Sequence, residues 1–341
     1  MKQSSDIRNL LPEQVGEAVV ALGCPAYRAR QILNHLYQRD TRSFADMTDL
    51  PIALREALAR GFSMDQPVCE REVRGEDGTR KALLRFTGGG RVETVLIASD
   101  DRRTVCVSTQ IGCARRCLIC TSGVHGLTRS LEPSEIVAQV LYWKGRGSAP
   151  DNVVFMGMGE PFDNFDHVMK AVAILNHPEA CGIAARKIAV STCGVIPGIL
   201  KFAELGGQVR LSLSLHATDD GLRDELMPVN KKYPLKELLA ACRVYRERTG
   251  RQMTIEYALI RDVNDQPDDA ERLILLARDL GASVNLIGCS PVPGSALHPT
   301  HPEGCLRFAQ RLRGKHIRTT LRVSRGADIL AACGQLAGGR R

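Results

Sequence analysis

The sequence predicts an α/β protein in which a small helical domain and a β-hairpin precede a partial or complete parallel β/α barrel. Residues 1–65 carry helical patterns alone, residues 70–100 alternate between apolar and polar side chains, and short β-rich runs alternate with helical patterns from residue 104 onward. The hydrophobic share of 44% and the charged share of 25% are typical of a globular protein, which excludes the disordered and fibrous classes.

The N-terminal stretch predicts three helices, over residues 13–23, 27–38 and 51–61. Pro12 opens the first, and Pro51 stands at a suitable first position for the third. A proline is tolerated there because the first amides of a helix have no partner within it. We therefore predict a helical unit at the start of the chain.

The next stretch predicts a β-hairpin. KALLRF at 81–86 and RVETVLI at 91–97 alternate between apolar and polar residues, and the glycines at 88–90 separate them. Such alternation places the two sets of side chains on opposite faces of a sheet, and glycine permits the tight turn. We predict domain boundaries of 1–65 for the helical unit, 66–100 for the hairpin extension and 101–341 for the barrel.

The remainder of the chain predicts the barrel. Its β-rich runs lie at 104–108, 152–156, 187–191, 209–215, 253–259, 284–288 and 319–323. Helical patterns lie between most of them, for example at 132–144, 235–247 and 267–280. Strands that alternate with helices imply right-handed βαβ units and a parallel sheet. Because β/α barrels place their chemistry at the carboxyl ends of the strands, we expect the functional residues just after these runs.

The charge balance and hydropathy restrict the partners. The chain has 46 basic and 38 acidic residues, a net charge of +8. An ordinary basic protein is one interpretation, and a polyanionic partner, foremost RNA or DNA, is the other. No apolar stretch reaches the roughly 18 residues that a membrane-spanning helix needs, and the N-terminus has no apolar signal core. We therefore expect a cytoplasmic protein without a membrane partner.

Three of the twelve cysteines crowd into one loop after the first predicted barrel strand. Cys113, Cys117 and Cys120 form a C-x3-C-x2-C pattern. Structural zinc usually takes four ligands from paired elements, and no second pair follows here. Three thiolates on one short loop suit a [4Fe–4S] cluster that leaves one iron open for a substrate. The loop therefore predicts an iron–sulfur site, with zinc as the alternative.

The cluster loop resembles the radical S-adenosylmethionine (SAM) superfamily, and further segments resemble its RlmN/Cfr family of RNA adenosine methyltransferases. These segments are VETV at 92–95, VCVSTQIGC at 105–113, GMGEP at 157–161, STCGVIPG at 191–198, SLHA at 214–217, MPVNKKYP at 227–234 and DILAACGQLAG at 328–338. The helical start resembles the RNA-binding N-terminal domain of the RlmN branch. The resemblance implies a radical-SAM partial barrel, one [4Fe–4S] cluster on three cysteines, and two SAM molecules per turnover.

The resemblance also implies which residues bind SAM. They are Gly159, Glu160, Ser191, Ser214, Leu215, His216 and Ser290. Glycine lets backbone approach a ligand closely, and a carboxylate can accept hydrogen bonds from an ammonium group. Taken alone, GMGEP fits an ordinary strand-to-helix turn and His216 fits a core histidine. Two positions depart from the family pattern, because Ile119 replaces the usual aromatic residue and Ser290 replaces an asparagine.

Two distant thiols and one carboxylate complete the implied site. In the family pattern Cys333 takes a methyl group from one SAM, and a radical made from the second SAM activates that methyl group for addition to adenine. Glu93 then accepts the ring proton, and Cys106 attacks the sulfur of Cys333, which releases the methylated base and leaves a disulfide. Alone, each cysteine reads as a core residue and Glu93 as a solvated strand carboxylate.

The expected substrate is adenine in 23S rRNA, with tRNA as a further candidate, and carbon 2 is favoured over carbon 8. The implied partners are a flavodoxin-type electron donor and a thiol reductant, and the expected state is a monomer. Three alternatives stay open at this point. They are a carbon 8 methyltransferase of the Cfr type, a radical-SAM methylase paralogue acting on another RNA, and a non-catalytic metal-bearing RNA-binding protein.

Overall fold

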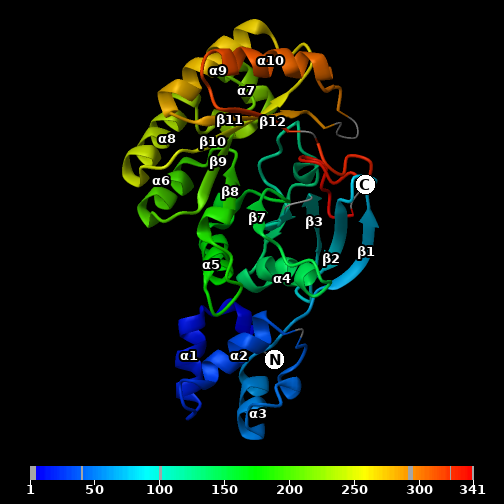
Figure 1. Ribbon diagram of the computed structural model, residues 1–341, viewed down its shortest axis with the longest axis vertical. Helices are drawn as coiled ribbons and strands as arrows, with labels where there is room; N and C mark the ends of the chain where they lie inside the picture. Colours follow the sequence, from blue (N-terminus) through cyan, green and yellow to red (C-terminus); the bar gives the residue numbers. More distant parts are fainter. Residues whose placement is uncertain (1–4, 40, 100–101, 291–294, 323, 340–341) are drawn as a thin grey trace.

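The computed structural model describes residues 5–39, 41–99, 102–290, 295–322 and 324–339. It is an elongated molecule with the N-terminal helices at one end and the barrel helices α8, α9 and α10 at the other (Figure 1). Residues 100 and 101, at the predicted start of the barrel, and residue 323, the last of a predicted strand, lie outside the described residues.

The three N-terminal helices are confirmed. They are α1 (Pro12–Ala21), α2 (Arg28–Tyr37) and α3 (Ile52–Gly61), with the 3-10 turns η1 (Ile7–Asn9) and η2 (Phe44–Asp46) beside them. Pro12 is the first residue of α1, as predicted. Pro51 instead caps α3 from outside, with extended backbone angles of φ −55° and ψ 142°. Apolar side chains at helical spacing, such as Val15 and Val19 of α1, are fully buried and hold the unit together.

One ten-stranded sheet forms the body of the protein, in the order β1-β2-β3-β4-β7-β8-β9-β10-β11-β12. The strands are β1 (Val68–Arg74), β2 (Arg80–Arg85), β3 (Arg91–Ser99), β4 (Arg102–Cys106), β7 (Asn152–Phe155), β8 (Ile188–Thr192), β9 (Arg210–Ser214), β10 (Thr254–Leu259), β11 (Ser283–Gly288) and β12 (Thr319–Arg322). In this sheet the neighbouring strands β4, β7, β8, β9, β10, β11 and β12 pair in parallel, which confirms every predicted barrel strand.

The hairpin is larger than the sequence predicts. The strands β1, β2 and β3 pair antiparallel, so the extension has an additional first strand. The sequence of β1, VCEREVR, carries no apolar alternation and most of its residues are exposed, which explains why it was missed. Moreover, β3 pairs with β4, with Val95 opposite Cys106, so the extension continues the barrel sheet.

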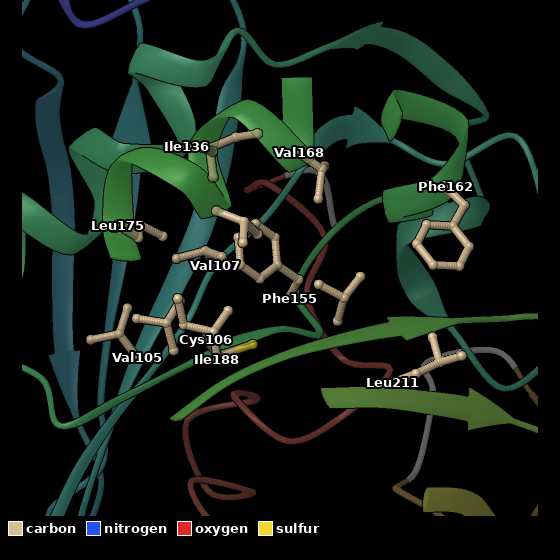
Figure 2. Close-up of a cluster of buried hydrophobic side chains, with 14 of the residues drawn as sticks. Val105, Cys106, Val107, Ile136, Phe155, Phe162, Val168, Leu175, Ile188 and Leu211 are labelled. Carbon is tan, nitrogen blue, oxygen red and sulfur yellow. The ribbon is translucent and has the colours of Figure 1, made fainter. Parts of the chain in front are cut away.

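Helices pack on the outer face of the barrel sheet (Figure 1). They are α4 (Pro133–Lys144), α5 (Phe165–Asn176), α6 (Ile196–Leu205), α7 (Asp220–Leu226), α8 (Leu235–Thr249), α9 (Pro267–Leu280) and α10 (Pro302–Gly314). Figure 2 shows Val105 and Val107 among core side chains of these layers, including Ile136 and Leu175. Neighbouring strand residues point to opposite faces, so Cys106 is directed away from Val105.

The carboxyl ends of the parallel strands carry the irregular segments. After β4 the chain forms β5 (Gln110–Gly112), the loop with the clustered cysteines, η3 (Thr121–Gly123) and β6 (Leu127–Ser130). The remaining 3-10 turns are η4 (Pro161–Asn164), η5 (Ala185–Lys187) and η6 (Pro228–Lys231).

Within the described ranges, no helix combines the length and apolar character needed to cross a membrane.

Candidate active site

A pocket lies at the carboxyl ends of the barrel strands and collects most of the predicted site residues. Its lining includes Cys113, Cys117, Cys120, Gly159, Glu160, Ser191, Ser214, His216, Ser290 and Cys333. Leu215 is outside this lining, with its side chain fully buried in the hydrophobic core, and Cys106 and Glu93 are outside it as well. Ser214 and Leu215 are consecutive residues at a strand end and cannot both face the pocket. The SAM-binding role expected for Leu215 therefore does not involve an exposed side chain, and it stays a prediction.

The cysteine loop is held by the protein around it. The amide of Cys113 donates to the carbonyl of Gly126 at 3.1 Å, and the amide of Leu118 donates to the carbonyl of Leu226 at 2.9 Å. The guanidinium of Arg115 pairs with Asp163, with 2.7 Å between Nε and Oδ2. Burial raises the pKa of the Cys113 thiol to about 12 and also raises that of Cys117. These thiols are therefore protonated at neutral pH until a metal displaces the proton.

The number and placement of the three thiols fit a cluster with three protein ligands. Among the described residues, no three His, Cys, Asp or Glu side chains lie close enough together to ligate one metal ion. A tetrahedral zinc with Zn–S bonds of about 2.3 Å requires sulfur atoms about 3.8 Å apart. In a [4Fe–4S] cluster each thiolate binds a different iron, so the sulfurs stand farther apart. Cys113, Cys117 and Cys120 all line the pocket, so a cluster placed there could take one ligand from each.

Glu160 is a buried carboxylate at the end of β7. Its Oε1 accepts from the amide of Phe162 at 3.0 Å and its Oε2 accepts from the amide of Cys193 at 2.8 Å. Desolvation raises its pKa, while these hydrogen bonds oppose the rise. The acid thus lines the pocket with its orientation fixed from both sides.

The glycines of GMGEP serve close packing within the protein. A Cβ atom on Gly157 would lie 2.7 Å from Ser108 Oγ, and one on Gly159 would lie 2.6 Å from Gln110 Cβ. Gly159 also has φ +98°, which side chains rarely tolerate. The sequence predicts that these glycines let the backbone approach a ligand closely. In the structure they also let it pack closely against the strand that leads into the cysteine loop.

Several other residues that line the pocket have polar side chains. Ser191 Oγ and Ser214 Oγ lie 3.3 Å apart. His216 adopts a left-handed backbone with φ +57°, and its Nδ1 accepts from the amide of Ala258 at 2.9 Å. Burial, with a smaller contribution from Arg223, lowers the pKa of His216 to about 3, so the ring is neutral. The buried hydroxyl of Ser290 has no hydrogen-bond partner within the described part of the chain, which suits a bound ligand.

Two further charged residues lie in the pocket lining or directly beside it, although the sequence did not single them out. Glu256 of β10 lines the pocket, accepts from Asn285 Nδ2 at 2.7 Å, and has a pKa raised by burial. A carboxylate inside the apolar run MTIEYAL was the signal that could have found it. Arg223 is fully buried and donates to the carbonyls of Cys193 and Leu215. It braces two strand-end loops, and no local sequence signal marks it.

The two distant thiols meet at this site. Cys333 lines the main pocket and also a second cavity, which Cys106 and Arg322 line as well. Both are free thiols. Burial raises the pKa of Cys106 to about 12 and raises that of Cys333, while the positive charge of Arg322 acts in the opposite direction on both. Cys333 is exposed as a residue, and it borders both cavities.

Glu93 lies apart from both cavities. It is 4% exposed, and its Oε1 lies 2.9 Å from Lys81 Nζ. Its Oε2 accepts from the amides of Ala337 at 2.6 Å and Gly338 at 3.1 Å. Glu93 is thus neither a solvated strand carboxylate nor a residue that lines the pocket in this structure.

Comparison with known proteins agrees with this arrangement. Residues 107–274 match the family model of the radical SAM superfamily, and residues 5–63 match that of the ribosomal RNA large subunit methyltransferase N-terminal domain. The probable dual-specificity RNA methyltransferase RlmN of Gemmatimonas aurantiaca is 46% identical over 94% of this chain and 89% of that protein. The dual-specificity RNA methyltransferase RlmN of Geotalea uraniireducens is 43% identical over 98% of this chain and 96% of that protein.

A solved structure is similar over nearly the whole chain. The crystal structure of a radical SAM methyltransferase from Sphaerobacter thermophilus has a TM-score of 0.92 and 44% sequence identity. The similarity covers 98% of this chain and 99% of that one, so it includes both the N-terminal helices and the C-terminal segment with Cys333.

Proposed function

Because the chain belongs to the RlmN family of radical-SAM RNA methyltransferases, we propose that it methylates carbon 2 of adenine in 23S rRNA and in tRNA. It is a SAM-dependent methyltransferase of a superfamily that carries a [4Fe–4S] cluster. Relatives described as dual-specificity RNA methyltransferases support two classes of RNA substrate. We also propose that it works as a cytoplasmic monomer with a flavodoxin-type electron donor and a thiol reductant.

The observation that supports the proposal most directly is the position of Cys333. It lines the pocket of the three clustered cysteines and the adjoining cavity of Cys106. A thiol that must first receive a methyl group near the cluster and later react with a second thiol needs access to both places. An idle RNA-binding protein has no use for this arrangement.

The residues of the pocket divide the work. Cys113, Cys117 and Cys120 would hold the cluster, which when bound supplies the electron for reductive cleavage of SAM. Glu160, Ser191, Ser214, His216 and Ser290 would bind SAM through their polar groups, and the backbone of Gly159 would pass close to it. Two SAM molecules are used per turnover, one as methyl donor and one as radical source.

The thiols would divide the methylation into two easier stages. The thiolate of Cys333 attacks the methyl carbon of the first SAM, S-adenosylhomocysteine leaves, and Cys333 carries the methyl group as S-methylcysteine. Once the carbon is joined to adenine and Glu93 has taken the ring proton, Cys106 attacks the sulfur of Cys333, so that the S–C bond breaks and a disulfide forms. The freed carbon takes up a proton, and the odd electron left from the radical step would return to the cluster that the three loop cysteines would hold. A thiol reductant then restores both thiols.

The test is mass spectrometry of nucleosides from rRNA and tRNA after incubation with reconstituted enzyme, SAM and reductant. The RNA must come from cells that lack both adenine-carbon methylations. We expect 2-methyladenosine from both RNAs, no product with Cys333→Ala, and normal product with Cys24→Ala, a thiol that lines neither cavity. Formation of 8-methyladenosine would move the protein to the carbon 8 branch. Release of 5′-deoxyadenosine without either product would refute the substrate.

A further inference from the structure

We propose that Lys81 is a positioning residue for the reaction: together with Glu93 it clamps the segment that carries Cys333 from both flanks. The inference rests on the proposed function, because it takes Cys333 as the methyl carrier. Lys81 Nζ donates to the carbonyl of Leu330 at 2.8 Å, three residues before Cys333. Glu93 Oε2 accepts from the amides of Ala337 and Gly338, which follow Cys333. The ion pair of 2.9 Å joins the two halves.

The register of the extension explains why these side chains meet. Glu93 of β3 lies opposite Leu83 of β2, and Lys81 lies two residues from Leu83 on the same face. Long side chains at such diagonal positions reach one another across antiparallel strands. The C-terminal segment runs beside β2 and β3 (Figure 1), and the hydrogen bonds of Lys81 and Glu93 reach it.

The segment has a particular need for such a clamp. Its described residues, 324–339, form neither helix nor strand, and Leu330 and Gly334 have left-handed backbones with φ +52° and +82°. Backbone groups in such a segment depend on side chains for hydrogen-bond partners. Here Lys81 and Glu93 supply them at both ends of the run that includes Cys333.

Burial makes the pair unlike a surface ion pair. The side chains of Lys81 and Glu93 are each 6% exposed. Taking two charges out of water is costly, so a buried pair is poor evidence of stabilisation and better explained by a role in fixing one conformation. Removal of either charge leaves the other side chain buried without its ion-pair partner. The C-terminal segment is then held less firmly on the side of the substituted residue.

Other contacts hold the segment at single points. Asp77 of the β1–β2 turn accepts from the amide of Gly326 at 2.9 Å. On the opposite side, the amide of Thr121 donates to the carbonyl of Gly334, and Ser122 Oγ donates to the carbonyl of Leu336, both at 2.7 Å. Cys333 is therefore set between the extension and the cysteine loop, and the Lys81–Glu93 pair contacts the segment on both sides of it.

The decisive measurement is methyl loading of Cys333, which precedes any proton transfer from adenine. Enzyme loaded with cluster is mixed with SAM, and the mass of the Cys333 peptide is followed with time. We expect loading to slow at least tenfold in Lys81→Met and in Glu93→Gln, with partial recovery in Lys81→Arg. A Glu93 that served only as a base would leave loading in Glu93→Gln unchanged, and that result would overturn the clamp.

Hydrogen exchange of the resting enzyme gives a readout independent of activity. We expect faster exchange in peptides covering 330–338 in Lys81→Met and Glu93→Gln, because two of these amides lose their charged acceptor or its support. The matched control is Arg85→Met, which removes a basic residue of the same strand paired with Glu70 and touches no part of the segment. Equal exchange in Lys81→Met, Glu93→Gln and wild type would refute the inference.

Methyl loading of Cys333 separates failure of the proposed function from failure of the clamp. If wild-type enzyme never acquires a methyl group on Cys333, the proposed function is wrong whatever Lys81 does. If wild type loads Cys333 and both clamp variants load it at the same rate, the proposed function stands and the clamp is wrong. A variant with a lower melting temperature but wild-type loading would show that the pair serves stability alone.

Discussion

Cys106 and Cys333, separated by almost the entire barrel in sequence, face one cavity together with Arg322. Cys106 closes the first barrel strand, and Cys333 lies on the C-terminal segment that crosses beside it. Burial raises the pKa of both thiols, so each stays protonated at neutral pH, although Cys333 as a residue is exposed.

Replacement of Cys106 by alanine should trap the reaction at a covalent stage. Without the second thiol nothing attacks the sulfur of Cys333, so the RNA stays joined to the protein. We expect a protein–RNA adduct on a denaturing gel and, after nuclease digestion, an adenine-bearing Cys333 peptide by mass spectrometry. Cys24→Ala should give free product and no adduct. Free methylated RNA from Cys106→Ala would contradict the assigned role.

Replacement of Cys117 by alanine should remove the iron. One thiolate fewer leaves two ligands for the cluster, so anaerobically purified protein should lose its brown colour and its broad visible absorption. The control is Cys193→Ala, which removes a thiol from the same pocket but outside the loop and should retain iron. A colourless wild-type protein containing zinc would disprove the cluster.

Removal of the Ser290 hydroxyl should weaken SAM binding without loss of stability. The hydroxyl is buried and lacks a partner among the described residues, so the protein alone gains nothing from it. In Ser290→Ala we expect SAM to bind about fivefold more weakly, equivalent to about 1 kcal/mol for one hydrogen bond. Titration calorimetry and a thermal melt of the SAM-free protein check the two parts. A lower melting temperature would show that the hydroxyl has a structural partner.

His216 should make the protein lose stability as the pH falls below neutrality. Its pKa is about 3 in the folded protein and about 6.5 when unfolded, so the unfolded chain binds the proton first. Its contribution is complete above pH 6.5 and declines by about 1.4 kcal/mol per pH unit below that. His216→Asn keeps an acceptor and tolerates the left-handed backbone, so its denaturation free energy should vary less between pH 6.5 and 5. If the denaturation free energies of His216→Asn and wild type depend equally on pH, His216 is not the source of the pH dependence.

Gly159→Ala should cost far more than Gly147→Ala. Both glycines have positive φ angles, +98° and +72°, so the conformational strain is shared. A Cβ on Gly147 meets nothing within 4 Å, whereas one on Gly159 meets Gln110. We expect Gly159→Ala to lose about 1–3 kcal/mol more from overpacking, together with SAM binding. Urea denaturation of both variants measures the difference, and equal losses would show that strain alone matters.

The sequence predicted the parts of the molecule that depend on local pattern. The barrel strands are short apolar runs, and the clustered cysteines lie within one loop, so both could be read without the fold. Leu215 is buried although its neighbours Ser214 and His216 line the pocket, a difference that residue alternation at a strand end explains. Lys81 and Arg223 could not be found because their roles depend on carbonyls, carboxylates and loops that come together only after folding.

The same limit applies to β1, whose charged sequence concealed a strand. This outer strand of the sheet carries four charged side chains of both signs, those of Glu70, Arg71, Glu72 and Arg74. An open edge normally invites a strand from another molecule, and charged side chains discourage such pairing. The charged strand β1, which local pattern could not reveal, thus disfavours edge-to-edge pairing with another molecule. Without it, the more apolar β2 would become the exposed edge of the sheet.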